Sequence, residues 1–348
     1  MPQGAITKHM ENFENGAESQ MPAGENINFE SRLDLRKLQD SIVAVKAELA
    51  SVIVGQHKMV DQLLVAFLSN GHVLLEGVPG VAKTITAKLL ARTLNIDFGR
   101  IQFTPDLMPS DILGTSVFDL KKSEFEFRKG PIFSNLILID EINRAPAKTQ
   151  AALFEVMEER QITIDGQSYP MDAPFLVIAT QNPIEQEGTY RLPEAQLDRF
   201  LFKISIDYPK LDEEIAIIQR EHNLQDHGKL DNIKTLLSAE DIKQYQSLVK
   251  QIIVEPHLLE YIAKIVVNTR ENAFLYLGAS PRASIAILNA AKGFAAIRGR
   301  DFVTPEDIKE AAIPVLQHRV IVTPEREMEG LTSTAIIKTI LESVEIPR

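Results

Sequence analysis

The sequence predicts an α/β fold in which a parallel sheet is flanked by helices, followed by an all-α C-terminal domain. Three short runs are apolar at every position, residues 73–75, 136–139 and 175–179, and helical stretches separate them. Runs of this kind are typical of strands in a sheet that is covered on both faces. After residue 209 the strand patterns stop, and the remaining chain shows helical periodicity.

Composition excludes several classes of protein. The chain has 348 residues, with 37 Lys and Arg against 48 Asp and Glu, so its net charge at pH 7 is −11. This acidic balance argues against a surface committed to nucleic-acid phosphates. The absence of cysteine excludes disulfides, thiolate metal sites and cysteine nucleophiles. No window is long and apolar enough for a membrane helix, and we expect a cytoplasmic protein.

The length favours two domains at about 150 residues each. Residues 1–30 are polar and read as a flexible leader, and helical patterns begin near Leu33 and at residue 58. We place the α/β domain at residues 31–208 and the helical domain at 209–348. The helices predicted in the second domain cover residues 211–220, 239–253, 256–269, 281–298, 305–316 and 332–343.

A glycine-rich loop follows the first predicted strand, residues 73–76, and a helix is expected from Ile85 onward. This order of strand, loop and helix is the context that a P-loop requires. Its backbone N–H groups would surround a phosphate, while Lys83 would reach the β- and γ-phosphates and Thr84 would bind magnesium. Ala82 stands where this motif has its second glycine, which we expect to be tolerated if the residue is already helical. The predicted nucleotide-binding residues here are Gly77, Val78, Pro79, Gly80, Val81, Ala82, Lys83, Thr84 and Ile85.

Polar residues follow the next two predicted strands. Asp140 and Glu141 end the strand at residues 136–139, and Asn182 follows the strand that ends at Ala179. The carboxyl ends of parallel strands are where such sheets carry their chemistry. Asp140 fits the carboxylate beside magnesium, Glu141 fits the base that polarises the attacking water, and Asn182 could contact the γ-phosphate or orient the water.

In the helical domain, Arg282 lies in the first turn of a predicted helix, directly after Ser280-Pro281. The helix macrodipole disfavours a cation at this end. The position therefore suggests an anionic partner, here a nucleotide phosphate.

Together these motifs resemble the AAA+ ATPases of the MoxR type, in the helix-2-insert branch that also contains magnesium-chelatase ATPase subunits. The resemblance covers roughly residues 33–340. The segments that carry it are Val54-Gly55-Gln56, residues 77–84, residues 102–114, Asp140-Glu141-Ile142-Asn143-Arg144-Ala145, the loop of Asn182, residues 192–200 and Ser280-Pro281-Arg282.

The resemblance implies an ATP-driven ring, usually a hexamer, with ATP and Mg²⁺ bound between neighbouring subunits. Asp140 and Glu141 would then form the Walker B pair and Asn182 would be sensor 1. Arg199 looks like the arginine finger offered to the neighbour's γ-phosphate, although Arg191 is a rival for that role. Arg282 looks like sensor 2, linking the helical lid to the nucleotide. Val54 and Gln56 would line the adenine pocket.

Two predicted hairpins could contact a substrate. One pairs residues 117–120 with 124–128, and the other pairs residues 161–164 with 167–170 around Asp165-Gly166, a strong signal for a type I′ turn. In the family such elements project toward the pore or the partner, but a hairpin can also simply extend a sheet edge.

The family resemblance leaves more than one function open. The first hypothesis is an ATPase that remodels or activates a client protein, with a separate von Willebrand A-domain protein as partner. The second is the motor subunit of a metal chelatase, which uses the same catalytic residues. A nucleic-acid motor is disfavoured because no run combines aromatic and basic residues. The seven histidines show no metal-ligand spacing.

Overall fold

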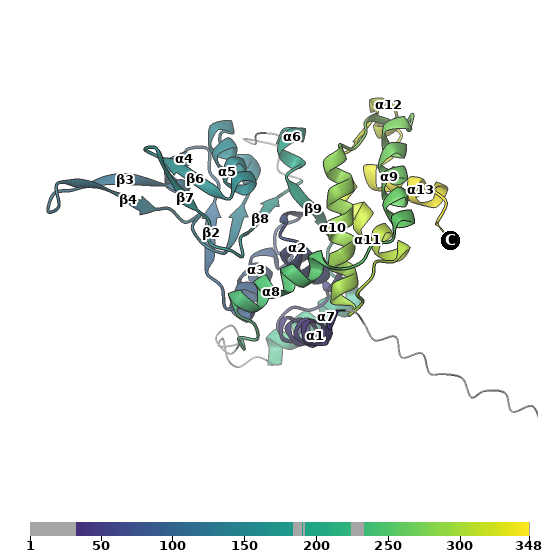
Figure 1. Cartoon of the computed structure of the whole chain (residues 1–348), viewed down its shortest axis with the longest axis horizontal. Helices are drawn as coiled ribbons and strands as arrows, with labels where there is room; N and C mark the ends of the chain where they lie inside the picture. Colours follow the sequence, from purple (N-terminus) through teal and green to yellow (C-terminus); the bar gives the residue numbers. More distant parts are fainter. Residues whose placement is uncertain (1–32, 184–189, 191, 224–232, 348) are drawn as a thin grey trace, which may run out of the picture. The chain divides into compact units, whose positions relative to one another are not determined.

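The computed structural model describes residues 33–183, 190, 192–223 and 233–347, and residues Leu33–Arg348 form one compact unit (Figure 1). The predicted leader, residues 1–30, and Arg191 lie outside the described residues. None of the described helices is both long and apolar enough to cross a membrane.

Five parallel strands form the central sheet in the order β2-β5-β8-β1-β9. This confirms the predicted α/β class. Edge strand β2 was not predicted, because its side chains are buried only at alternate positions and Arg100 lies exposed in its middle. The strands are β1 (His72–Gly77), β2 (Phe98–Gln102), β5 (Leu136–Asp140), β8 (Leu176–Gln181) and β9 (Phe200–Ile206).

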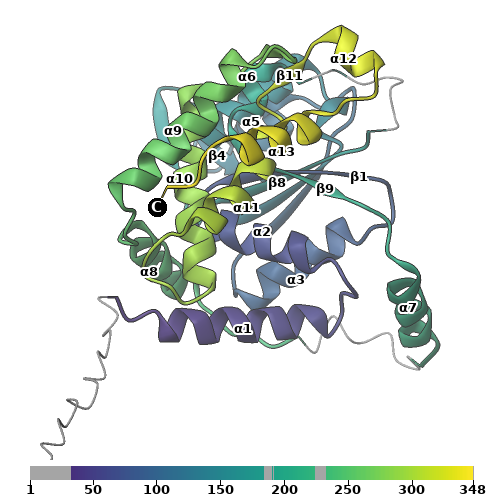
Figure 2. The same ribbon diagram turned by 90° about the vertical axis from the view of Figure 1, so that its right-hand side faces the viewer.

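The two faces of the sheet pack into different cores, because successive side chains of a strand point to opposite faces. Val73 and Leu138 belong to a core that includes α1 (Arg36–Ala50), α2 (His57–Leu68), α3 (Lys83–Thr93) and the C-terminal helices. Leu74 and Ile137 belong to a second core with α4 (Pro109–Leu113) and α5 (Ala147–Glu159). Figure 2 shows α1, α2 and α3 together beside the strands. Burial on both faces explains why these strands are apolar throughout.

The C-terminal lid is built mainly of helices, as predicted, but it also contains a short antiparallel ladder that the sequence pattern did not reveal. The ladder pairs β10 (Leu275–Leu277) with β11 (Ile321–Val322). The helices after the sheet are α7 (Leu211–Asn223), α8 (Ala239–Lys250), α9 (Pro256–Glu271), α10 (Pro281–Ile297), α11 (Pro305–Leu316), α12 (Pro324–Met328) and α13 (Ser333–Ser343).

Helix α10 packs closely against α2 of the α/β core. A Cβ atom at Gly293 would lie 2.7 Å from a Val65 methyl group and 2.8 Å from the Ser69 hydroxyl, so this crossing requires glycine. The lid is thereby held against the core at its longest helix.

Both predicted hairpins form. The first pairs β3 (Gly114–Asp119) with β4 (Glu124–Lys129), and the second pairs β6 (Gln161–Ile164) with β7 (Gln167–Pro170). Asp165 and Gly166 both have positive φ, at 51° and 78°, which agrees with the predicted type I′ turn. The β3–β4 hairpin extends away from the rest of the described chain (Figure 1).

Candidate functional site

Most of the predicted phosphate-binding residues, the acidic pair and Asn182 meet at the carboxyl edge of the sheet. They line a cavity of about 430 Å³. The loop after β1 faces the ends of β2, β5 and β8 across this cavity. The lining residues are Pro79, Gly80, Ala82, Lys83, Thr84, Ile85, Arg100, Gln102, Asp140, Glu141, Thr180 and Asn182.

The P-loop turns into α3 through two residues with positive φ. Gly80 has a φ of 87°, and Ala82, the N-cap of α3, has a φ of 62° and a ψ of 17°. The condition on which Ala82 was expected to be tolerated, a helical backbone conformation, is not met, because the residue is in the left-handed region. A residue with a Cβ atom in the left-handed backbone region costs about 1 kcal/mol or more in conformational free energy. The Lys83 ammonium donates a hydrogen bond to the Gly77 carbonyl oxygen at 2.6 Å, across the loop.

Asp140 ends β5 and is only 8% exposed. Arg100 Nε lies 2.8 Å from its Oδ2 atom, and the Thr180 hydroxyl donates to its Oδ1 atom at 3.3 Å. Arg100 reaches Asp140 from the neighbouring strand, because β2 and β5 are paired in parallel. The carboxylate is therefore fixed from both neighbouring strands.

Glu141 has a φ of 57°, so the chain bends sharply where the strand ends. Gln102 Nε2 donates a hydrogen bond to its Oε2 atom at 3.0 Å, and Arg144 Nε lies 3.0 Å from the same oxygen in an ion pair. Its own N–H donates to the Thr180 hydroxyl at 3.1 Å. The carboxylate is thus oriented at the cavity, which suits a group that must polarise a water molecule.

The residues that hold these carboxylates were not given roles from the sequence. Arg100, Gln102 and Thr180 each lie on a strand beside Asp140 or Glu141 in the sheet, whereas they are far away in the chain. Arg144 follows Glu141 by three residues, and this spacing was a usable signal.

The predicted adenine-pocket residues, Val54 and Gln56, do not line this cavity. Gln56 donates through Nε2 to the Asp207 carbonyl oxygen at 3.4 Å, just after β9. Val54 is half-buried. Gly77, Val78 and Val81 form the loop itself rather than the cavity wall. Asn182 lines the cavity, as expected from its position after β8.

The oxygen donors at this edge fit magnesium. Thr84 and Asp140 both line the cavity and offer the hard oxygen ligands that Mg²⁺ prefers. In the described part of the chain, no group of three or more His, Asp or Glu side chains could hold a metal by itself. A magnesium ion here would therefore be held largely by phosphate oxygens and water.

Arg199 and Arg282 lie elsewhere, at the amino edge of the sheet. Arg199 directly precedes β9, and Phe200 pairs with His72 at the start of β1. The phosphate loop begins at the other end of β1, roughly 20 Å away for a six-residue strand. Arg282, expected to link the helical lid to the nucleotide, does not line the cavity beside the phosphate loop of its own chain. Both arginines instead line a separate cavity of about 260 Å³.

A buried ion pair fixes the segment of Arg199 against the lid. Arg319, whose side chain is 3% exposed, lies 2.6 Å from the Asp198 carboxylate and donates to the carbonyl oxygens of Phe200 and Leu201. The Ser280 hydroxyl donates to the other Asp198 oxygen at 3.0 Å. Ser280 is the N-cap residue of α10, and its hydroxyl makes this contact instead of a capping hydrogen bond. Nothing in the sequence motifs singled out Arg319.

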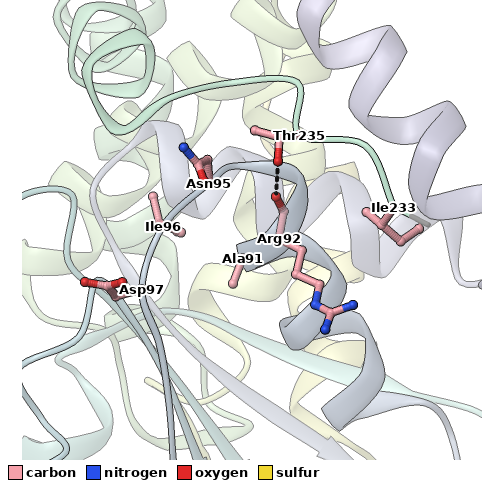
Figure 3. Close-up of a pocket in the computed structure, with 7 residues that line it drawn as sticks. All are labelled: Ala91, Arg92, Asn95, Ile96, Asp97, Ile233 and Thr235. Atoms are coloured by element: carbon pink, nitrogen blue, oxygen red, sulfur yellow. Dashed lines mark hydrogen bonds between the residues drawn. The ribbon is translucent and has the colours of Figure 1, made fainter. Parts of the chain in front are cut away.

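A further cavity of about 350 Å³ lies at the C-terminal end of α3 (Figure 3). The Thr235 hydroxyl donates to the Arg92 carbonyl oxygen at 3.5 Å, and the Arg92 guanidinium points away from Thr235. Its described lining residues form no acid–base pair or phosphate cradle, and we assign it no role.

Comparison with known proteins agrees with this geometry. Residues 72–202 match the family model described as "ATPase family associated with various cellular activities (AAA)", and residues 267–340 match the AAA lid domain. The chaperone MoxR1 of Mycobacterium tuberculosis is 45% identical over 310 residues, which cover 86% of this chain and 81% of that protein.

This chain belongs to the MoxR family of AAA+ ATPases. Like the family, it binds nucleotide and hydrolyses ATP. A crystal structure of a proposed ATPase from Cytophaga hutchinsonii superposes with a TM-score of 0.83 at 44% identity, covering 90% of this chain and 97% of that one. A magnesium-chelatase subunit homolog of Methanocaldococcus jannaschii is more distant, at 27% identity over 53% of this chain and 50% of its own length.

Proposed function

We propose that this MoxR-family ATPase works in the cytoplasm as a Mg-ATP-hydrolysing hexameric ring that remodels or activates a client protein. The observation that carries the proposal is the division of the site between two edges of one sheet. Lys83 and Glu141 lie at the carboxyl edge, and Arg199 and Arg282 lie at the amino edge. A complete site therefore needs two copies of the chain, joined head to tail.

Each group then has a defined task. Lys83 binds the β- and γ-phosphates, and Thr84 and Asp140 hold the Mg²⁺ ion that neutralises phosphate charge. Glu141, oriented by Gln102 and Arg144, accepts a hydrogen bond from the attacking water and takes its proton. Asn182 orients the water or the γ-phosphate. Arg199 and Arg282 of the neighbouring copy stabilise the negative charge that develops on the phosphoryl group.

The exposed β3–β4 hairpin is an argument in favour of a protein as the client. Phe118, Leu120 and Phe125 near its tip are exposed, and Lys121 and Lys122 lie between them. A patch of apolar side chains on a projecting hairpin is suited to contact with another polypeptide. From the family resemblance we expect a separate von Willebrand A-domain protein as partner. The chelatase alternative is less favoured, because the chelatase homolog matches only about half of this chain.

The test measures ATP turnover and solution mass together, with and without Mg-ATP, across a range of protein concentrations. Specific activity should rise as a ring-sized species forms. Glu141→Gln should bind ATP but turn it over far more slowly, and Lys83→Ala should lose nucleotide binding. A monomer with full turnover at every concentration would contradict the shared site.

Mixing variants tests whether Arg199 acts on the neighbour. Arg199→Ala should hydrolyse slowly while binding ATP normally. When Arg199→Ala is mixed with Glu141→Gln, some interfaces join an intact Glu141 to an intact Arg199, so part of the activity should return. If no mixing ratio restores turnover, Arg199 does not act across the interface.

A further inference from the structure

The two arginines at the amino edge converge on one carboxylate. Arg199 Nε lies 2.7 Å from Glu158 Oε2, and Arg282 Nη2 donates to Glu158 Oε1 at 2.7 Å. Each carboxylate oxygen therefore serves one arginine. The three residues come from separate segments: the last turn of α5, the loop before β9 and the first turn of α10.

Neither helix favours the charge that it carries there. A carboxylate at the C-terminus of α5 faces the negative end of that helix, and a cation at the N-terminus of α10 faces the positive end of the other. Local helix electrostatics thus oppose both Glu158 and Arg282. Pairing the two charges offsets this cost, and another anion delivered to Arg282 would offset the part of it that falls on Arg282.

The cluster is accessible to such an anion. The side chains of Glu158, Arg199 and Arg282 are 34%, 30% and 56% exposed, and all three line the cavity of about 260 Å³. Ion pairs with this exposure contribute little stability and can exchange partners. The neighbouring Asp198–Arg319 pair is far more buried, which suits a permanent structural contact.

The Arg199 side chain is supported from behind. Its guanidinium lies 5.8 Å from the centre of the Phe154 ring, and Phe154 packs edge-on against Phe200. Exchange of the anion would therefore leave the position of Arg199 largely unchanged.

We propose that Glu158 is a positioning residue that occupies, within each free subunit, the place that a terminal phosphate of the neighbouring subunit's nucleotide takes on assembly. Arginine pairs with carboxylates and with phosphates in the same geometry, so one anion can replace the other. Glu158 holds Arg199 and Arg282 together until the phosphate replaces it, and its carboxylate competes with the phosphate for the two arginines. This inference rests on the proposed function, in which both arginines act on a neighbour.

The test compares the protein concentration that gives half-maximal ATP turnover in the full chain and in Glu158→Gln. The variant keeps the shape of the side chain but removes the competing charge, so this concentration should fall about fivefold. Turnover at saturating protein concentration should stay within about twofold. Glu159→Gln is the matched control. It removes a negative charge from the adjacent residue, and in the described part of the chain no ion pair joins Glu159 to either arginine.

Two further variants make the result specific. Glu158→Asp retains the charge but is too short to bridge both arginines, so it should also lower the half-maximal concentration. In an Arg199→Ala, Arg282→Ala background, Glu158→Gln should have no effect on ATP-dependent assembly, because the groups through which it acts are gone.

The outcomes separate the two proposals. If the unaltered chain shows no ATP-dependent assembly, the proposed ring function fails. If that chain assembles normally but Glu158→Gln behaves like Glu159→Gln, the exchange fails while the ring function stands. A loss of turnover at saturating protein concentration, with an unchanged midpoint, would also overturn the exchange.

Discussion

The Asp198 carboxylate and the Arg319 guanidinium lie 2.6 Å apart and join the residue before Arg199 to the C-terminal lid. Burial lowers the pKa of Arg319, and the hydrogen bond that its guanidinium donates to Asp198 opposes that shift. The position of the predicted arginine finger thus depends on a lid residue 120 positions later in the chain, because Arg319 also binds the carbonyl oxygens on either side of it.

Asp198→Ala should therefore lower the free energy of unfolding by about 3 kcal/mol, since it leaves a buried guanidinium without its carboxylate. Urea unfolding followed by circular dichroism measures this. Glu194→Ala, on the exposed face of α6 (Glu194–Leu197), is the control and should change stability by less than about 0.5 kcal/mol. Equal effects of the two variants would show that the ion pair is not needed for stability.

Ala82→Gly should stabilise the protein by about 0.5–1 kcal/mol, because it relieves the left-handed conformation at the N-cap of α3. Thermal unfolding is the measurement. The same substitution at Ala87, inside α3 and fully buried, should destabilise by about 1 kcal/mol. If both variants lose stability equally, the strain assigned to Ala82 is not present in solution.

The buried His72 makes stability depend on pH. Burial lowers its pKa to about 4, and its Nδ1 atom accepts a hydrogen bond from the Val177 N–H. Above about pH 6.5 neither the folded nor the unfolded chain is protonated at this residue. Between about pH 6.5 and pH 4 only the unfolded chain takes up the proton. The free energy of unfolding therefore decreases as the pH is lowered through this range, by about 3 kcal/mol in total.

In urea titrations between pH 4 and 6.5, His72→Gln should reduce the dependence of the free energy of unfolding on pH by roughly 1.4 kcal/mol per pH unit, which corresponds to one proton. His318, whose pKa burial also lowers, keeps a slope of the same sign in the variant. The exposed His257→Gln is the control. An unchanged slope in His72→Gln would remove this residue from the pH dependence.

Replacing Leu120 and Phe125 by serine should weaken binding of a permanently unfolded, carboxymethylated test protein by about tenfold, because two exposed apolar side chains leave the contact. Fluorescence anisotropy of the labelled test protein gives the affinity. Met328→Ser removes an equally exposed apolar side chain from the lid and should have little effect. Equal affinities for both variants would exclude the hairpin as the client surface.

The sequence predicts the parts of this fold whose signal is local. The central strands are apolar because both faces are covered, and the P-loop, the acidic pair and the Asp165-Gly166 turn each need particular residues within a few positions. Strand β2 and the β10–β11 ladder are short or exposed, so their patterns are weak.

The sequence motifs predicted the residues of the phosphate loop, the acidic pair and Asn182, but not the side chains that hold them or the contact between the two arginines and Glu158. Lys83, Asp140, Glu141 and Asn182 come together because parallel strands end at one edge. The contact of Arg199 and Arg282 with Glu158 depends on how the lid packs on the core, which no short motif records. The left-handed Ala82 was missed because the conformation of a loop residue follows from the whole turn.

The direction of the strands gives the proposed assembly a polarity. Every copy offers a phosphate loop on one side and a pair of arginines on the other, so an open row of subunits always ends in one loop without arginines and one arginine pair without a loop. Closing the row unites these two ends and completes the last site. Ring closure would therefore be a gain of catalytic capacity as well as of stability, and a broken ring would lose one active site for each gap.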